Sequence, residues 1–468
     1  MLVGASPLTY RCRLVLSHAN RFAGAERHSV TRINAEHSLV RALGVWGLAA
    51  SIVNITVGGG IFRLPASAAA ALGPAAPIAY IVCAVAMGLV VLCFAEAGSR
   101  VSLTGGLYAY VEVAFGPLVG FVCGLMLWAG ISVATAAVAS FFADALGALI
   151  PAVATGTPRN VTLAVILLAF GALNIAGVRG AARFITVMTV AKLLPLLLLI
   201  VVGAMAVRGD ALRWTSAPST GDVARASAVL IFAFLGVESA LVPSGEVRDP
   251  SRTVPRAIFI AMTAVTVLYL AVQIVAQGIL GAGLANEKTP LAAAAAVVMG
   301  EFGRKLILVG STVSMFGYLS GMILSGPRML FAFGRDGFLP APLALVHSRF
   351  HTPYIAIAVQ TILVTIVAIV GKFEMLALIA NGTMLLVYAA CCVAVLVLRQ
   401  RDVHQAGTPF RPPLAGAIPI FALVVIVWLL ASLTADEWKA MLVLLGVAIV
   451  VYAASLPSRR AASVRSSA

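Results

Sequence analysis

The chain has 468 residues, of which 61% are hydrophobic and only 10% are charged, and its mean hydropathy is +1.05. Soluble domains carry roughly 25% charged residues, so this composition excludes an ordinary soluble protein and indicates one embedded in a lipid bilayer. The formal charge is +15, yet no basic stripe alternates with stacking aromatic side chains, which excludes a nucleic-acid partner.

Apolar runs long enough to cross roughly 30 Å of hydrocarbon recur along the whole chain. Twelve membrane-spanning helices are predicted, centred near residues 52, 84, 130, 168, 194, 232, 268, 316, 361, 386, 423 and 447. They leave no room for a soluble enzyme module, so we expect one transmembrane domain over residues 42–456. A flexible cytoplasmic tail is expected at residues 1–41, and a second cytoplasmic tail at residues 457–468.

The distribution of basic residues predicts how the chain is oriented. If both termini are cytoplasmic, about two thirds of the 32 Lys and Arg residues fall on the inner side, which is the positive-inside bias of membrane proteins. We therefore expect a multi-pass protein of the inner (cytoplasmic) membrane with both ends in the cytoplasm.

Three consecutive glycines, Gly58, Gly59 and Gly60, interrupt the first predicted span. Each costs a helix about 1 kcal/mol relative to alanine, so the helix is predicted to stop there. The triplet either lets two helices pack closely or forms an unwound segment whose free N–H groups bind a carboxylate, helped by the positive end of the half-helix that follows. We favour the second explanation, because unwound backbone at bilayer depth is tolerated where it lines a cavity.

Lys192 lies inside the fifth predicted span. It either extends to the inner interface or is buried as a functional charge. A second interruption follows in the sixth span, at Phe232-Ala233-Phe234-Leu235-Gly236-Val237-Glu238. Glu238 must pair, accept backbone hydrogen bonds or stay protonated, and we favour a role in holding the broken helix or in gating. Paired broken helices in the two halves of a chain point to a transporter's substrate site.

No metal centre, cofactor or enzyme active site is expected. Five of the six cysteines lie in apolar runs without a CxxC pair, and all six histidines lie in the N-terminal tail or in loops. The spans contain no nucleotide-binding loop and no serine–histidine pair.

Five motifs in order resemble those of the amino acid–polyamine–organocation (APC) transporters. They are Gly58-Gly59-Gly60-Ile61-Phe62, Phe94-Ala95-Glu96-Ala97-Gly98-Ser99-Arg100, Gly105-Gly106-Leu107-Tyr108-Ala109-Tyr110, the Phe232–Glu238 stretch with the loop from Gly245 to Ile258, and the stretch from Ser325 to Pro340. The resemblance covers residues 43–455. It implies an all-α, LeuT-like fold of two inverted five-helix repeats, spans 1–5 and 6–10, plus two extra helices, with spans 1 and 6 discontinuous.

The resemblance also implies roles for individual residues. Gly58, Gly59, Gly60 and Ile61 would hold a substrate carboxylate, with Gly59 standing where many relatives carry serine. Carbonyls around Phe232, Ala233, Leu235 and Gly236 would accept from its ammonium group, and Phe232 would close over the substrate unless it simply packs in the core. Lys192 would replace sodium by bonding first-helix carbonyls, with Ser311, Thr312 or Ser314 as acceptors on the eighth span. Arg63 departs from the family pattern. It either biases the outer mouth toward anions or is an interfacial arginine, and we favour the second explanation.

Substrate class follows from two departures from the arginine/agmatine antiporters. Met322 aligns with their tryptophan and Thr135 with their asparagine, so the aromatic that stacks on a guanidinium is missing. With Val138 and Phe232 these residues would form a mostly apolar pocket. We expect a sodium-independent secondary transporter of neutral L-amino acids that works by alternating access, through proton symport or exchange. The alternatives are a cationic amino acid or polyamine carrier, and an amino-acid sensor without net transport.

Overall fold

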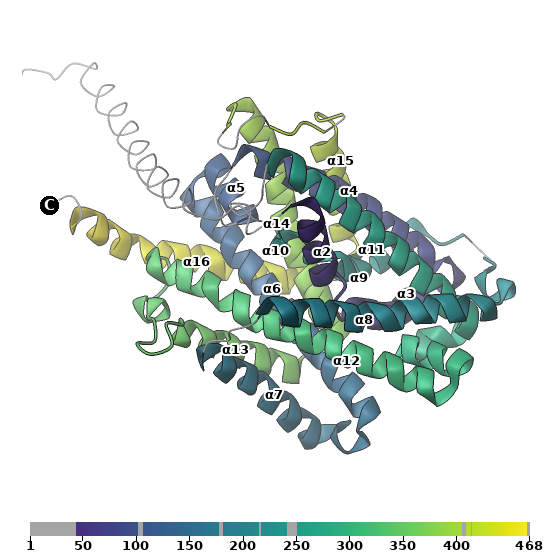
Figure 1. Ribbon diagram of the computed structural model, residues 1–468. Coiled ribbons are helices and arrows are strands. Elements are labelled where there is room, and N and C mark those ends of the chain that lie inside the picture. The colour runs from purple at the N-terminus through teal and green to yellow at the C-terminus, as the bar shows by residue number, and fades with distance from the viewer. Residues whose placement is uncertain are drawn as a thin grey trace, which may run out of the picture.

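The computed structural model describes residues 44–101, 106–176, 181–214, 217–240, 250–404, 409–412 and 414–465, so the predicted tail at 1–41 lies outside the described residues. Long helices pack side by side (Figure 1), and the described ranges contain no β-strand. The α-helices are α2 (Val45–Thr56), α3 (Gly60–Leu72), α4 (Ala76–Arg100), α5 (Leu107–Phe115), α6 (Pro117–Leu149), α7 (Gly156–Ala176), α8 (Ala181–Gly203), α9 (Thr220–Phe234), α10 (Val237–Ala240), α11 (Pro250–Leu280), α12 (Pro290–Arg335), α13 (Tyr354–Val370), α14 (Phe373–Gln400), α15 (Ile418–Ala431) and α16 (Ala435–Arg465).

Every predicted span centre falls within one of these helices. The first and sixth spans each consist of two helices, α2 with α3 and α9 with α10. By length and composition, seven helices of the described part could cross a membrane, and four shorter ones are also apolar: Val45–Thr56, Lys192–Ala206, Tyr354–Val370 and Ile418–Ala431. This pattern is that of a multi-pass membrane protein.

Two long helices are preceded by short ones that hydropathy did not predict. The short helix α5 ends at Phe115, and the next residue, Gly116, has a φ of +90°. α6 then begins at Pro117, whose ring already constrains φ to a helical value. In α12, Gly300 has a φ of +62° and bends the helix after its first ten residues, 290–299. Glycine is the residue that adopts such angles without strain. At the other end of the chain, α16 continues to Arg465, past the predicted domain end at residue 456.

Contacts between helices of spans 1–5 and helices of spans 6–10 occur in matched pairs. α6 packs on α14 as α12 packs on α8, and α2 packs on α11 as α9 packs on α4. α4 also packs on α11, α6 on α12, and α7 on α13. If each of spans 1–5 is replaced by its counterpart among spans 6–10, and the reverse, these same helix contacts are obtained.

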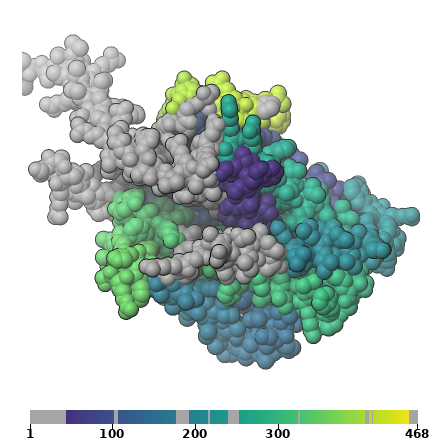
Figure 2. All heavy atoms as spheres, in the orientation of Figure 1, coloured from purple at the N-terminus to yellow at the C-terminus, as the bar shows by residue number. Residues whose placement is uncertain are grey.

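Large apolar side chains remain exposed on the outer helices. Val427 of α15 is 62% exposed, and Val450 of α16 is 67% exposed. The first described helix, α2, purple in Figure 2, also reaches the molecular surface, and its Trp46 is 76% exposed. Such surfaces suit contact with lipid acyl chains, which are as apolar as these side chains.

Candidate substrate site at the two broken helices

The first predicted span is interrupted at the glycine triplet. α2 ends at Thr56, residues 57–59 are not helical, and α3 begins at Gly60. The Gly58 N–H donates to the Thr56 carbonyl at 2.8 Å, and no side chain caps the start of α3. An uncapped helix N-terminus presents free N–H groups and a partial positive charge. The start of α3 therefore carries the partial positive charge that attracts a carboxylate.

The sixth span is interrupted at Leu235 and Gly236. Gly236 has a φ of +115°, and a Cβ there would lie 2.7 Å from Ile55 Cγ2 of α2. The Glu238 carboxylate accepts the Gly236 N–H with both oxygens at 3.0 Å, and the Tyr388 hydroxyl donates to Glu238 Oε2 at 2.8 Å. Glu238, which is only 5% exposed, thus folds back onto the turn that precedes it.

The two interruptions lie against each other. A Cβ on Gly60 would be 3.2 Å from the Ala233 Cα. The Tyr269 hydroxyl of α11 lies 2.8 Å from the Ala233 carbonyl and 3.0 Å from the Thr56 carbonyl, so its single proton is shared between the ends of α9 and α2. One phenol therefore links both broken helices.

Lys192 reaches the first broken helix from α8. Its side chain is 5% exposed, and Nζ donates to the Asn54 carbonyl of α2. On α12, the hydroxyls of Ser311 and Thr312 donate to the Leu308 carbonyl at 2.9 and 2.7 Å. Ser314 Oγ is buried and has no hydrogen-bond partner among the described residues. Lys192 therefore contacts a first-helix carbonyl, whereas the Ser311 and Thr312 hydroxyls bond within α12.

A small pocket lies at the sixth-span interruption. Its walls are mostly apolar, with one carboxyl group and one phenol. They are formed by Gly130, Ile131 and Ala134 of α6, Leu235, Gly236 and Glu238 at the interruption, Tyr318 and Met322 of α12, and Met384 of α14.

Four of the predicted site residues, Leu235, Gly236, Glu238 and Met322, line this pocket. The other eight, Gly58, Gly59, Gly60, Ile61, Thr135, Lys192, Phe232 and Ala233, do not.

Packing explains where three of these eight lie. A Cβ on Gly59 would meet Met315 Cγ at 3.1 Å and Val138 Cγ1 at 3.2 Å, so side chains fill the space beside the triplet. Phe232 packs edge-on against Phe373 with ring centroids 5.5 Å apart. The Thr135 hydroxyl donates to the Ile131 carbonyl one turn earlier, at 2.7 Å.

Four tyrosine and methionine residues at the site were not identified from the sequence: Tyr269, Tyr318, Met384 and Tyr388. Each lies in an apolar span, where a tyrosine or methionine is as readily explained by core packing. A tyrosine hydroxyl that is buried needs a hydrogen-bond partner, so buried tyrosines at bilayer depth were the available signal for Tyr269 and Tyr388.

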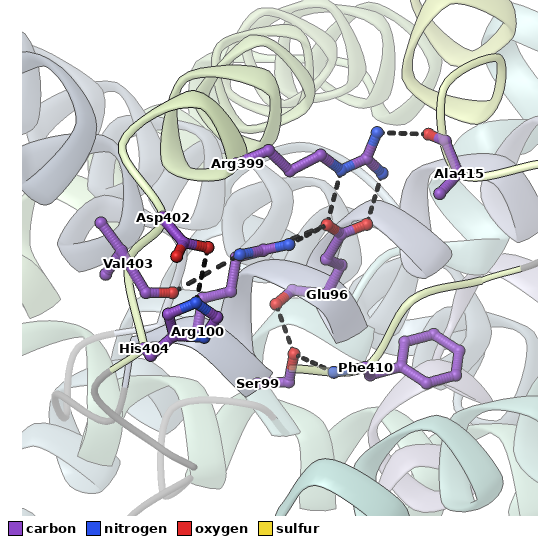
Figure 3. A network of polar contacts seen from close by, with 9 residues as sticks. All are labelled: Glu96, Ser99, Arg100, Arg399, Asp402, Val403, His404, Phe410 and Ala415. Atoms are coloured by element: carbon purple, nitrogen blue, oxygen red, sulfur yellow. Dashed lines mark hydrogen bonds and ion pairs between the residues drawn. The ribbon is translucent and has the colours of Figure 1, made fainter. Parts of the chain in front are cut away.

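The second motif of the sequence forms a buried ionic network, drawn in Figure 3. Glu96, near the end of α4, is fully buried. Its Oε1 lies 3.1 Å from Arg100 Nη2 and 2.6 Å from Arg399 Nε of α14, and its Oε2 pairs with Arg399 Nη2. One carboxylate therefore joins two guanidinium groups from two helices.

Backbone groups of the segment after α14 complete this network. Arg399 Nη1 donates to the Ala415 carbonyl, and Arg100 Nη1 to the Val403 carbonyl at 3.5 Å. Ser99 Oγ accepts the Phe410 N–H at 2.8 Å. The network thus fixes the end of α4 against α14 and the described parts of the connection to α15 (Figure 3).

Arg63, on α3, makes an ion pair with the opposite end of α14. Its Nη2 lies 2.6 Å from Glu374 Oε1, and its Nη1 donates to the Lys288 carbonyl at 2.7 Å. The side chains of Arg63 and Glu374 are 18% and 43% exposed, respectively. An exposed carboxylate pairs with this arginine, so the arginine does not offer an unpaired charge to an anion.

Comparison with known proteins identifies the family. The family model described as amino acid permease matches residues 43–454. The chain is 30% identical to the methylthioribose transporter of Bacillus subtilis, over 89% of this chain and 93% of that protein. It is 29% identical to the serine/threonine exchanger SteT, covering 90% and 97% of the two chains, and 26% identical to the branched-chain amino acid permease BcaP, covering 90% and 94%, both from the same organism. Similarity to these transporters extends over nearly the whole chain, and the chain belongs to the amino acid permease family.

Proposed function

We propose that this chain is a secondary active transporter that carries neutral L-amino acids across the cytoplasmic membrane by alternating access. The observation that carries the proposal is the meeting of two interrupted helices beside a pocket. Interrupted helices at the bilayer midplane supply free N–H groups for a carboxylate and free carbonyls for an ammonium group. These are the two groups that every α-amino acid presents.

The pocket favours a neutral side chain. Glu238 is its one acidic residue, and the carboxylate already accepts hydrogen bonds from Gly236 and Tyr388. The remaining walls are dominated by Ile131, Leu235, Met322 and Met384. The names of two relatives, a serine/threonine exchanger and a branched-chain amino acid permease, agree with a neutral amino acid.

A second candidate substrate is a neutral solute without an α-amino group. The methylthioribose transporter is 30% identical to this chain, and a thiosugar would also suit a mostly apolar pocket. It would leave the ammonium-accepting carbonyls of the sixth span without a partner, which is why we place it second.

Coupling is proposed to be independent of sodium. The Lys192 ammonium donates to the Asn54 carbonyl, so a fixed positive charge already neutralises backbone acceptors at the end of α2. Transport would then be driven by a proton gradient or by exchange of substrates.

Twelve crossings in two inverted repeats, with both ends in the cytoplasm, are proposed as the architecture. The matched helix contacts between the two halves support the repeat. A glycine with positive φ also stands at corresponding places, Gly116 before α6 and Gly300 before the long part of α12. A broken helix near the start of each half supports it as well.

Flux in proteoliposomes tests the proposal. We expect uptake of labelled alanine, serine, threonine or leucine, in buffers with and without sodium, and stronger competition by these amino acids than by arginine, agmatine, glutamate or methylthioribose. Strong competition by agmatine without competition by alanine, serine or leucine would refute the substrate class. Saturable binding without flux under any gradient would indicate a sensor instead.

A further inference from the structure

Asn381 of α14 is a buried polar residue outside the set of proposed substrate groups. It lies in the third turn of α14 and is fully buried. Its Nδ2 donates to the Ala228 carbonyl at 2.7 Å and to the Val229 carbonyl at 3.1 Å, both on α9. The amide nitrogen is assigned to this side because a flipped amide would place its oxygen against two acceptors. One side chain of α14 therefore holds two adjacent carbonyls of the broken sixth span.

These two carbonyls also take part in the hydrogen bonds that form the last turn of α9. In an α-helix each N–H donates to the carbonyl four residues earlier, so Ala228 receives the N–H of Phe232, and Val229 receives that of Ala233. A carbonyl oxygen has two lone pairs and can accept from both donors at once. Asn381 thus bonds to the backbone groups that set where Phe232 and Ala233 lie, just before the helix ends.

Other contacts hold the same turn. The Tyr269 hydroxyl of α11 lies 2.8 Å from the Ala233 carbonyl. α14 reaches the turn a second time through Phe373, whose ring packs edge-on against that of Phe232, with 5.5 Å between centroids. The last turn of α9 is therefore fixed from α11 on one hand and from two positions of α14 on the other.

We propose that Asn381 is a positioning residue for the ammonium group of the substrate. The inference rests on the proposed function, in which carbonyls at the end of α9 accept hydrogen bonds from that group. The last four carbonyls of a helix have no partner within the helix, and their direction follows from the turn that carries them. Asn381 does not line the pocket, so it acts on the substrate through this turn.

A fixed set of carbonyls recognises an ammonium group more selectively than a mobile one. The group donates three hydrogen bonds, and acceptors that already hold their places lose little freedom when it binds. N-methylation replaces one of the three donors by a bulky methyl group, which fixed carbonyls reject and displaced carbonyls tolerate. If Asn381 only joined α14 to α9, its loss would lower stability and leave the choice between these two ligands unchanged.

Competition binding to the full chain in lipid nanodiscs measures this choice. Labelled L-alanine is displaced by unlabelled L-alanine or by N-methyl-L-alanine. Asn381→Leu keeps a side chain of similar size, Asn381→Ala removes most of it, and neither variant has a donor. We expect both to weaken L-alanine binding roughly two- to tenfold, the effect of losing about one hydrogen bond. The preference for L-alanine over its N-methyl derivative should fall by a similar factor.

Thr383→Ala is the matched control. Thr383 is fully buried on the same helix, and its hydroxyl donates to the Ile379 carbonyl of α14 itself, at 2.7 Å. This variant should keep the wild-type preference. The preference is a ratio measured on folded molecules, so a lower yield of protein does not alter it.

A wild-type preference in both Asn381 variants would overturn the proposal, whatever their stability. An equal fall of the preference in Thr383→Ala would overturn it as well, because any buried polar residue of α14 would then have the same effect. The two proposals fail in different ways. A wild-type protein that binds no neutral amino acid would refute the transport proposal, whereas normal binding with an unchanged preference would refute only the role of Asn381.

Discussion

Backbone groups hold two ionisable side chains at the broken helices. Lys192 donates to the Asn54 carbonyl, and Glu238 accepts the Gly236 N–H. A charge at bilayer depth costs at least a few kcal/mol unless it finds partners, and an unwound segment offers carbonyls and N–H groups that a regular helix does not. The interruptions therefore supply the backbone groups that bind these two side chains.

Removal of the Lys192 ammonium tests the proposed coupling. Lys192→Ala leaves the Asn54 carbonyl buried without its donor, which costs about 1–3 kcal/mol. We expect amino-acid flux to fall roughly tenfold or more, with expression maintained and with no requirement for sodium in the wild type. Lys305→Ala, at a position 66% exposed, should transport normally. Strict sodium dependence of the wild type would contradict the assignment, and so would full flux in Lys192→Ala.

Gly236→Ala tests the turn in the sixth span. The φ of +115° strains any residue with a Cβ, and that Cβ would lie 2.7 Å from Ile55 Cγ2. Strain of this kind costs about 1–3 kcal/mol, so we expect lower thermal stability and little flux. Gly88→Ala, in a helical part of α4 with no atom within 4 Å of the new Cβ, should be neutral or stabilising. Equal behaviour of the two variants would show that the turn tolerates other conformations.

Tyr269→Phe separates the shared hydroxyl from the packing of its ring. The variant keeps the ring against Phe234, at 5.3 Å between centroids, and deprives the Thr56 and Ala233 carbonyls of their donor. A neutral hydrogen bond contributes about 0.5–1.5 kcal/mol, which corresponds to a roughly two- to tenfold loss of flux. Tyr452→Phe, whose ring packs on Phe121 and Phe338, serves as the control. Unchanged flux in Tyr269→Phe would mean that the breaks do not depend on this link.

At the scale of helices, two ionic contacts fix opposite ends of α14. Arg399 joins its last turn to Glu96 of α4, and Glu374 joins its first turn to Arg63 of α3. The two contacts differ in burial, because Glu96 is fully buried and the Glu374 side chain is 43% exposed. We expect a large loss of folding stability only when the Glu96 contact is broken, because exposed ion pairs contribute about 0–1 kcal/mol to the free energy of unfolding.

Glu96→Gln tests the buried network. The substitution leaves Arg100 and Arg399 without their shared carboxylate, and removing one partner of a buried pair costs about 3–5 kcal/mol. We expect a thermal midpoint lower by several degrees and poor insertion. Glu301→Gln breaks an exposed pair with Arg304 and should change the midpoint little. Similar midpoints in the two variants would show that the network contributes no more than a surface ion pair.

At the scale of the whole molecule, hydropathy located the helices but not their partners. Every span centre predicted from an apolar run falls within a helix. The glycine triplet and the Phe232–Glu238 stretch marked the two breaks. Both predictions succeeded because the length of an apolar run and helix propensity are local properties of the sequence. The Glu96–Arg399 bond joins residues 303 positions apart, and no local pattern specifies such a pairing. The short helices before Gly116 and Gly300 were not predicted for a different reason. Each is too short to give a hydropathy signal separate from that of the long helix that follows it.

Orientation in the membrane is the remaining whole-molecule prediction, and two exposed positions test it. Ser219 precedes α9 and His404 follows α14, and both are exposed. The described cysteines are all buried, so a Cys12→Ser background gives little reaction with a membrane-impermeant maleimide. The positive-inside bias predicts that Ser219→Cys reacts in intact cells and that His404→Cys reacts only after the cells are opened. The reverse pattern at both positions would invert the proposed topology and place the Glu96 network at the outer face.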